Sequence, residues 1–317
     1  MSVTLAPMEG VVDQYMRDIL TRIGGIDLCV SEFIRVSNNI YPRRKFIEIC
    51  PELETGGKTA AGIPVHVQLM GGDPTLLAEN AEKVARIGAP GIDLNFGCPA
   101  KTVNRNDAGA TLLQWPERLY EVTSAVRRAV PDHIPVSAKM RLGFEDKSHF
   151  LENACAVEAA GASKLTIHAR TKLEGYRPPA HWDYLVPIRE ALSITVVANG
   201  EIWTREDFEK CRSICGYEHY MMGRGVIARP SLGLEVKDPA YSSFDWPHII
   251  HLLEDYDRLL QKMGQPLRQA GRLKQWIKLL GRTYPESADL FNRIRRLHSP
   301  EEIMSEVYLE RMAVVSK

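Results

Sequence analysis

Eight short β-rich runs recur along the first 225 residues, and segments with helical periodicity separate most of them. Strands that alternate with helices are typical of a parallel sheet covered by helices, and eight such units fit a (β/α)8 TIM barrel. A doubly wound open sheet is the alternative, but no Gly-rich dinucleotide fingerprint follows the first run. The sequence therefore predicts the barrel. The runs are Val3–Pro7, Leu28–Phe33, Val65–Leu69, Ile92–Asn95, Val136–Met140, Lys164–His168, Thr195–Asn199 and Tyr220–Gly223.

The pattern changes after Gly225, where an irregular linker at Asp238–Phe244 leads into a region without strand signals. We therefore predict a barrel domain over residues 1–240 and an all-α domain over residues 241–317. The expected barrel helices include Leu76–Ile87, Pro116–Val130, Leu151–Ala160 and Arg205–Ile214. The expected C-terminal helices are Pro247–Lys262, Pro266–Arg282, Ser287–Leu297 with Ser287 as a candidate cap, and Pro300–Ala313.

The composition is that of an ordinary soluble globular protein, with 44% hydrophobic and 25% charged residues. No apolar run is long enough to span a membrane, and the N-terminus lacks the basic start and apolar core of a signal peptide. Six cysteines are too few and too scattered for a disulfide scaffold in a chain of 317 residues. These features predict a cytoplasmic protein in a reducing compartment.

The run Ile92–Asn95 breaks at Gly97 and Pro99, and a cysteine lies between these two residues. Glycine tolerates strained dihedral angles and proline lacks a backbone donor, so the strand cannot continue and Cys98 begins a loop. In the predicted barrel this thiol lies at the mouth, where it can act as a nucleophile or as an acid. The alternative is an ordinary turn with a half-buried cysteine, since free cysteine often packs as a small hydrophobic residue.

Other polar residues also follow the apolar runs, at the barrel face where active sites form. The Gly-containing loops Asn199-Gly200-Glu201 and Gly223-Arg224-Gly225 are candidates for a phosphate site. Lys139 and His168 would face the same cavity, and together with the amide of Gln68 they suit a flat heterocycle that carries a phosphate. Flavin mononucleotide (FMN) fits this description. Lys139 could alternatively form a Schiff base, as in barrel aldolases.

A metal site is the weaker interpretation of another pair of cysteines. Cys211 and Cys215, with His219 nearby, have no further Cys or His that would complete four ligands. Cysteines four residues apart on a helix are usually buried in the core. We therefore expect no metal.

The C-terminal region carries a one-sided basic cluster. Between Gly264 and His298 there are eight Lys or Arg residues against two acidic residues, a local excess of six. On a helical wheel of Leu267–Arg282 the apolar residues share one face, and the basic residues lie on the other, which predicts a polyanion contact. The apolar set is Ala270, Leu273, Trp276, Ile277 and Leu280, and the polar set is Arg268, Arg272, Lys274, Gln275, Lys278 and Arg282, extended by Arg295 and Arg296. Basic residues expected on the mouth loops are Arg35, Lys101, Arg105 and Arg141.

Six short motifs combine at the expected strand ends. They are Ala6-Pro7-Met8-Glu9-Gly10, Asp93-Leu94-Asn95-x-Gly97-Cys98-Pro99-x-Lys101-x-Val103, Lys139-Met140-Arg141-Leu142-Gly143, His168-x-Arg170-Thr171, Ala198-Asn199-Gly200 and Met222-Gly223-Arg224-Gly225. Together they resemble the tRNA-dihydrouridine synthases, and the likeness extends over the whole chain. The segment Arg272–Trp276 resembles the bacterial subgroup that acts on uridine 16 of the tRNA D-loop.

The resemblance implies FMN at the barrel mouth, reduced by NADPH or NADH, and hydride transfer to C6 of an extruded uracil. Cys98 would then protonate C5, which requires a protonated thiol. The implied FMN-binding residues are Pro7, Met8, Glu9, Gln68, Lys139, His168, Asn199, Gly200, Glu201, Gly223 and Arg224. Asn95 would form a hydrogen bond with the uracil, and the other candidate tRNA-binding residues are basic. The full set of candidates is Arg35, Asn95, Arg141, Arg272, Lys274 and Arg295. We expect a monomer, because the basic surface must stay open.

One loop departs from the family pattern. Close relatives often have a more Gly-rich loop where this chain has Arg105-Asn106-Asp107. Since Asn and Asp tolerate left-handed backbone conformations, we expect the loop to close and the enzyme to be active.

Other functions remain open at this point. The same reaction could take place at another D-loop uridine, or the chain could be an FMN barrel oxidoreductase that acts on a small molecule. A non-catalytic tRNA-binding protein would explain the basic cluster but not Cys98. A Schiff-base aldolase that uses Lys139 is a more distant alternative.

Overall fold

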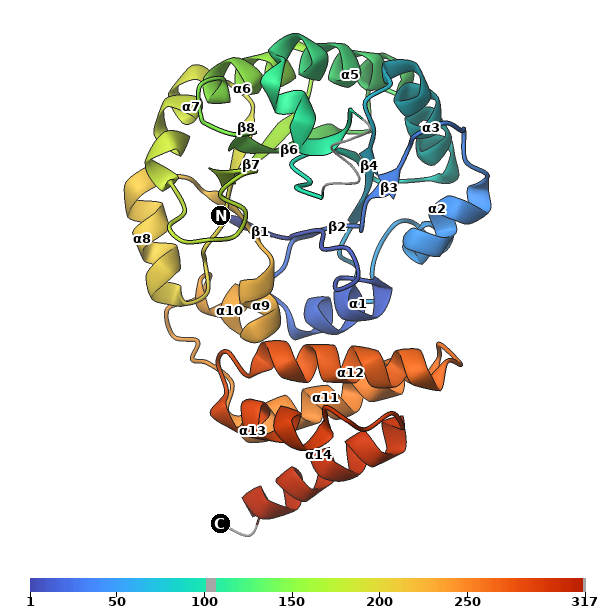
Figure 1. Cartoon of the computed structure of the whole chain (residues 1–317), viewed down its shortest axis with the longest axis vertical. Helices are drawn as coiled ribbons and strands as arrows, with labels where there is room; N and C mark the ends of the chain where they lie inside the picture. Colours follow the sequence, from blue (N-terminus) through green and yellow to red (C-terminus); the bar gives the residue numbers. More distant parts are fainter. Residues whose placement is uncertain (101–106, 316–317) are drawn as a thin grey trace.

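A closed barrel of parallel strands forms the larger part of the molecule (Figure 1). The computed structural model describes residues 1–100 and 107–315. Neighbouring strands pair in parallel in the order β2-β1-β9-β8-β7-β6-β5-β4, and pairing of β2 with β4 closes the ring. The short β3 pairs with the end of β4. The predicted TIM barrel is thus confirmed. The strands are β1 Ser2–Leu5, β2 Leu28–Val30, β3 Ile34–Arg35, β4 Val65–Met70, β5 Ile92–Phe96, β6 Val136–Gly143, β7 Lys164–Thr171, β8 Thr195–Asn199 and β9 His219–Met222.

Helices surround the barrel on its outside (Figure 1). Local sequence explains several of their boundaries. Helix α3 begins at Pro74 and Asp73 accepts a hydrogen bond from Leu76 N, whereas α8 begins with a reciprocal capping box between Thr204 and Asp207. The four predicted barrel helices are all present, with ends within about two residues of those expected. The described helices around the barrel are α1 Gln14–Ile23, α2 Arg43–Ile49, α3 Pro74–Ile87, α5 Pro116–Ala129, α6 Phe150–Ala159, α7 Leu185–Ala191, α8 Arg205–Cys215, α9 Arg224–Ala228 and α10 Leu232–Glu235, with 3-10 turns at Pro51–Thr55, Gly109–Gln114 and Trp182–Tyr184.

Four further helices form a bundle that packs against one side of the barrel (Figure 1). Helix α11 contacts α1, and α12 contacts α9. All five residues of the apolar face predicted for α12 are buried, and the indole of Trp276 donates a 3.0 Å hydrogen bond to the carbonyl of Ile227 in α9. This face therefore docks the bundle on the barrel. The helices are α11 Trp246–Gln261, α12 Pro266–Leu280, α13 Pro285–Ile294 and α14 Pro300–Val315.

The predicted cap of the third C-terminal helix is wrong. Helix α13 begins at Pro285, two residues earlier than expected, and its N-cap is Tyr284. The hydroxyl of Ser287 instead donates a 2.8 Å hydrogen bond to the carbonyl of Ile277 in α12. Ser287 thus joins two helices of the bundle.

In the loop after Cys98, the structure describes Pro99, Ala100 and the residues from Asp107 onward. Lys101, Arg105 and Asn106 lie outside the described residues, so the basic loop expected from them is not tested. Asp107 has a φ of 48°, in the left-handed region that we expected an aspartate to tolerate there. Over residues 1–100 and 107–315, no helix is long and apolar enough to cross a membrane.

Candidate active site

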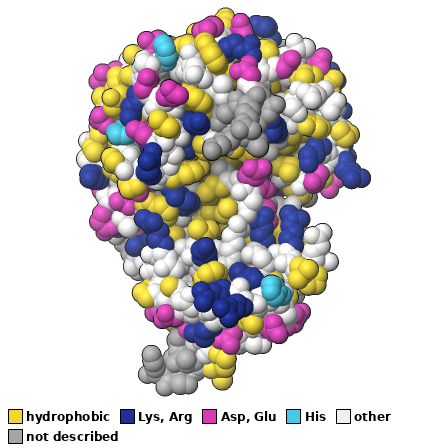
Figure 2. All heavy atoms as spheres, viewed as in Figure 1, with side chains coloured by type: hydrophobic (Ala, Val, Ile, Leu, Met, Phe, Trp, Pro, Cys, Tyr) yellow, Lys and Arg dark blue, Asp and Glu magenta, His cyan; other side chains and the backbone are white. Residues whose placement is uncertain are grey.

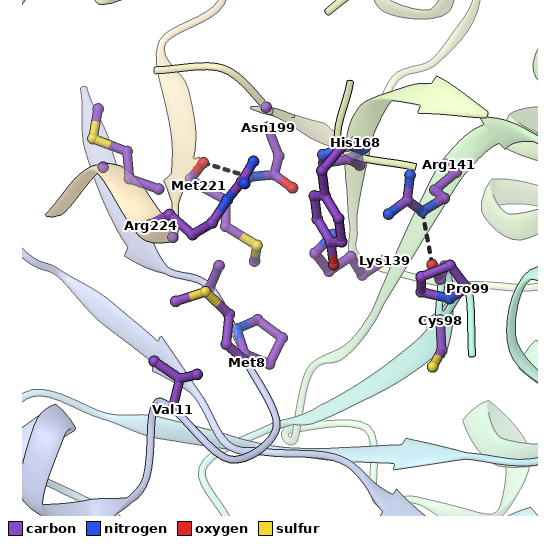
Figure 3. A pocket seen from close by; sticks show the side chains of 18 of the residues that line it. Met8, Val11, Cys98, Pro99, Lys139, Arg141, His168, Asn199, Met221 and Arg224 are labelled. Atoms are coloured by element: carbon purple, nitrogen blue, oxygen red, sulfur yellow. Dashed lines mark hydrogen bonds between the residues drawn. The ribbon is translucent and has the colours of Figure 1, made fainter. Parts of the chain in front are cut away.

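A cavity of about 520 Å³ lies at the mouth of the barrel, where the strands end (Figure 3). Its size is typical of a small-molecule site. The fold brings together here residues from seven strands or the loops that follow them. Of the predicted site residues, those that line the cavity are Pro7, Met8, Glu9, Asn95, Cys98, Lys139, Arg141, His168, Asn199, Gly200, Glu201, Gly223 and Arg224.

Cys98 lies at the rim of this cavity, two residues after the end of β5. Its side chain is nearly buried, and burial raises the pKa of the thiol above its ordinary value. The carboxylate of Glu9 raises this pKa as well, whereas the positive charges of Arg141 and Arg35 lower it. Burial is the largest of these effects, so the thiol is protonated at neutral pH and can donate a proton.

A chain of buried hydrogen bonds fixes the segment that carries Cys98. The carboxylate of Asp93 accepts from the hydroxyl of Ser137 at 2.6 Å and from the amide of Gln68 at 2.7 Å. The oxygen of the Gln68 amide accepts from Asn95 at 2.8 Å, and the oxygen of Asn95 accepts from Gly97 N at 2.9 Å. Because both oxygens of Asp93 accept hydrogen bonds here, the Gln68 amide turns its N–H toward Asp93 and its oxygen toward Asn95, and this sets the orientation of the Asn95 amide. Gln68 is fully buried behind Asn95 and is not among the cavity-lining residues, in contrast to the direct FMN contact expected from the resemblance.

Arg141 holds the same segment from the neighbouring strand β6. Its Nε donates to the carbonyl of Gly97 at 2.9 Å (Figure 3). Its Nη1 donates to the carbonyls of Thr171 and Gly175 at 3.0 and 2.8 Å. The guanidinium also lies 5.2 Å from the ring centre of Tyr176. Arg141 therefore ties the cysteine loop to the loop that follows β7.

Lys139 and His168 form a polar floor in the cavity. Burial lowers the pKa of Lys139 to about 7, and it lowers the pKa of His168 well below its ordinary value. Arg141 lowers both pKa values further. The Nδ1 atom of His168 is buried without a hydrogen-bond partner, and Lys139 makes no hydrogen bond to the residues that the structure describes. An anionic or strongly accepting ligand would satisfy both groups.

The two glycine loops suit close approach of a phosphate. Gly200 has a φ of 119°, a conformation that favours glycine, and Glu201 follows it with a φ of 60°. At Gly225 a side chain is excluded, because its Cβ would lie 2.1 Å from the carbonyl oxygen of Ile202. Glu201 forms an ion pair with the buried Arg170, and Arg224 at the rim makes no ion pair with a carboxylate among the residues that the structure describes. The unpartnered Lys139 and His168, together with these loops, fit FMN.

Sequence reasoning missed several residues of the site. Tyr176 and Trp203 line the cavity, and Arg170 and Asp93 support it from behind. The sequence offered one signal that could have indicated Tyr176, namely an aromatic residue in a polar loop just after a strand end. The partners of Asp93 and Arg170 lie 25 and 31 residues away along the chain and became apparent only in the folded molecule.

The wheel prediction for α12 is wrong at Arg272. This residue is buried against the barrel, not exposed: its Nη2 lies 2.6 Å from the carboxylate of Asp13, and its Nη1 donates to the carbonyl of Gly10. Lys274 is half-buried and donates to the carbonyl of Leu297 at 2.7 Å, whereas Arg295 is exposed. Lys and Arg side chains nevertheless gather on the face of the bundle beside the hollow of the barrel mouth (Figure 2). Contacts of these residues with tRNA stay a prediction.

Replacement of Arg272 by alanine is expected to destabilise the protein by about 3–5 kcal/mol, because the carboxylate of Asp13 would remain buried without its partner. Denaturant unfolding monitored by circular dichroism measures this free energy. Arg268 is exposed on the first turn of the same helix, so Arg268→Ala is the matched control and should change the stability by less than about 0.5 kcal/mol. Equal stabilities of both variants would contradict the docking role of Arg272.

A parallel barrel with a cationic cavity at its mouth and a protonated thiol on the rim defines an enzyme that binds a phosphorylated, ring-shaped cofactor. The family model described as dihydrouridine synthase (Dus) matches residues 4–308. The chain belongs to this family, and it is therefore a flavin-containing oxidoreductase.

Similar proteins cover nearly the whole chain. The tRNA-dihydrouridine(16) synthase of Pseudomonas putida is 49% identical, with 93% of each chain covered. The enzyme of the same name from Shewanella oneidensis is 47% identical, with 96% of each chain covered. The one from Vibrio parahaemolyticus is 45% identical over 100% of this chain and 98% of the relative.

Solved structures with the same barrel are more distant. The complex of 2-naphthoyl-CoA reductase has a TM-score of 0.57 and 14% identity, and it covers 74% of this chain and 49% of that chain. The old yellow enzyme homologue from Zymomonas mobilis has a TM-score of 0.51 and 14% identity, with 75% and 89% covered. At this identity they show a shared fold only.

Proposed function

We propose that this enzyme reduces the C5=C6 bond of uridine 16 in the D-loop of tRNA to give dihydrouridine. The observation that carries the proposal is the protonated thiol of Cys98 at the rim of a cavity suited to FMN. The relatives at 45–49% identity support the target position, since all three are named tRNA-dihydrouridine(16) synthase.

When bound and reduced by NADPH or NADH, FMN would supply the hydride for C6 of the uracil. The protein residues would hold this cofactor by complementary charge and shape. Lys139 and His168 offer polar atoms from the cavity floor, whereas the loops at Gly200 and Gly223 let backbone N–H groups approach a phosphate. Met8 supplies part of the apolar wall.

Cys98 donates the proton to C5 of the uracil. Asn95 positions the base, because its amide retains one N–H and one oxygen lone pair beyond its bonds to Gln68 and Gly97. A donor and an acceptor side by side match the neighbouring N–H and carbonyl groups on the edge of uracil. Burial around the thiol excludes water from the proton transfer.

The uridine must leave its stack to reach this cavity. The basic face of the bundle offsets that cost by neutralising tRNA phosphates. Residues 241–317 therefore act as the tRNA-binding domain, and residues 1–240 act as the catalytic domain. Arg35, which ends β3 of the barrel, and Arg295, at the end of α13 in the bundle, are further candidate contacts with tRNA. In this proposal the enzyme works as a monomer in the cytoplasm and needs no metal.

Site-resolved mapping of dihydrouridine tests the proposal. The tRNA comes from a strain that lacks the gene and from the same strain with the gene restored. We expect loss and recovery at position 16 alone. Loss of dihydrouridine at another D-loop position would support the proposed reaction but contradict position 16 as its target. No change in tRNA, combined with reduction of free uridine or a related small molecule, would support a small-molecule oxidoreductase instead.

A further inference from the structure

Two aromatic rings and two guanidinium groups alternate along a continuous row from the cavity to the bundle. The guanidinium carbon of Arg224 lies 4.7 Å from the ring centre of Tyr176 and 4.8 Å from that of Trp203. The guanidinium carbon of Arg282 lies 3.6 Å from the ring centre of Trp203. The row joins the loop after β7, the start of α9, the loop after β8 and the segment after α12.

Trp203 is held in place within this row. Its indole N–H donates a 3.1 Å hydrogen bond to Glu201, and its backbone N–H donates to the carboxylate of Asp207 at 3.0 Å. Glu201 also forms an ion pair with Arg170. The ring therefore offers a fixed platform on which the guanidinium of Arg282 stacks, which is a favourable cation–π contact.

The positive charges of Arg224 and Arg282 have no carboxylate partner among the residues that the structure describes. Stacking uses only the face of a guanidinium, whereas its N–H donors point outward in the plane of the group. A planar group held by its face is already oriented for a bidentate contact, which lowers the entropy cost of binding. Arg282 is exposed, so its donors are accessible. This arrangement suits an oxyanion with several oxygen atoms.

A second cavity of about 420 Å³ lies beside this row and shares Glu201 and Trp203 with the first. Its acidic residues are already engaged: Glu201 pairs with Arg170, and Asp207 caps α8. Arg229, on its wall, is paired with Glu235. Arg282 therefore supplies the uncompensated charge of this cavity.

We propose that Trp203 and Arg282 form a binding site for a phosphodiester group of the tRNA, close to the nucleotide that enters the active site. The inference rests on the proposed function and adds to it Trp203 and a specific contact for Arg282, which the sequence placed only on a general basic face. An RNA backbone is favoured over a small anion because the row continues from the cavity to the basic face of the bundle, along which a polyanion can extend (Figure 2).

Arg282→Ala tests this site through the affinity for tRNA at several salt concentrations. We expect the affinity to fall about tenfold at low salt, and the slope of log K against log salt to decrease by about one. Lys210→Ala removes one exposed charge from α8 on the outside of the barrel and is the matched control, with unchanged affinity and slope. Arg282→Lys keeps the charge but loses the planar stack, so its affinity should lie between those of the wild type and the alanine variant.

Three further readouts separate the possible outcomes. Flavin content and circular dichroism should match the wild type, which shows that the variant is folded. The KM for tRNA should rise while kcat is retained, and the rate of flavin reduction by NADPH without tRNA should be unchanged. An unchanged affinity for tRNA would overturn the proposed site. A defect that affects only the rate of flavin reduction by NADPH would overturn it as well. If wild-type protein formed no dihydrouridine in any tRNA, the proposed function itself would fail, whatever Arg282→Ala does.

Discussion

In a Cys98→Ala variant, dihydrouridine formation is expected to fall by about 10²- to 10⁴-fold, the range that a positioned general acid contributes. Flavin and tRNA should bind as in the wild type, because the side chain is small and lies at the rim of the cavity. Single-turnover measurement with flavin-reduced enzyme and tRNA lacking dihydrouridine isolates the chemical step. Cys155→Ala is the matched control, since this thiol is exposed on α6, outside the cavity lining, and its loss should leave the rate unchanged.

The pH dependence gives an independent check of the acid. Cys98 must be protonated to act, and burial raises the pKa of its thiol above the ordinary value. The single-turnover rate should therefore stay constant through neutral pH and fall only at alkaline pH, where the thiol ionises. A near-normal rate in Cys98→Ala, or a wild-type rate that rises as the thiol ionises, would remove Cys98 from this role.

Replacement of Lys139 by methionine is expected to abolish stable flavin binding and, at the same time, to stabilise the flavin-free protein. Methionine fills similar volume without a charge. The pKa of Lys139 is lowered from 10.5 to about 7 by burial, so the unfolded chain binds more protons than the folded chain between these values. Wild-type stability therefore rises with pH across this window, and below pH 7 the buried charge costs the most. Because Lys139→Met removes this cost, its melting temperature should rise by about 2–4 °C for each kcal/mol of stability that is gained.

Two measurements check this prediction. Flavin absorbance of the purified variant reports cofactor retention, and thermal unfolding of flavin-free protein between pH 6 and 10 reports stability. The advantage of Lys139→Met over the wild type should shrink as the pH rises. Lys164→Met is the matched control, because Lys164 begins β7 at the opposite end of the barrel and is not among the cavity-lining residues. A yellow Lys139→Met variant, or a Lys164→Met variant that also loses flavin, would contradict a specific role of Lys139.

Much of the site was accessible from the sequence because its residues occur at strand ends. In a parallel barrel the carboxyl ends of all strands meet at one face, so a local signal such as Gly97-Cys98-Pro99 also gives a position in space. The same logic placed Lys139, His168 and Asn199 in one cavity. For Gln68 this reasoning was only partly correct. The strand and its end were correct, but the amide is turned toward Asp93 and Asn95 behind the cavity wall.

The arrangement of the C-terminal basic cluster could be predicted only in part from the sequence. The periodicity of α12 correctly identified the apolar face, but charge alone placed Arg272 in solvent. The folded structure pairs it with Asp13, 259 positions earlier in the chain. Likewise, the stacking of Arg282 on Trp203 depends on how the bundle docks against the barrel.

The sequence by itself therefore determined the barrel, the order of its elements and the residues at each strand end, since period and turn chemistry are local properties of the chain. Only the tertiary structure decided which charges are paired, which amides face the cavity and which arginines remain free to bind a ligand. The physical reason is that burial and hydrogen-bond partners depend on segments that meet only when helices and strands pack. A charged residue looks the same in sequence whether solvent or a buried carboxylate is its partner.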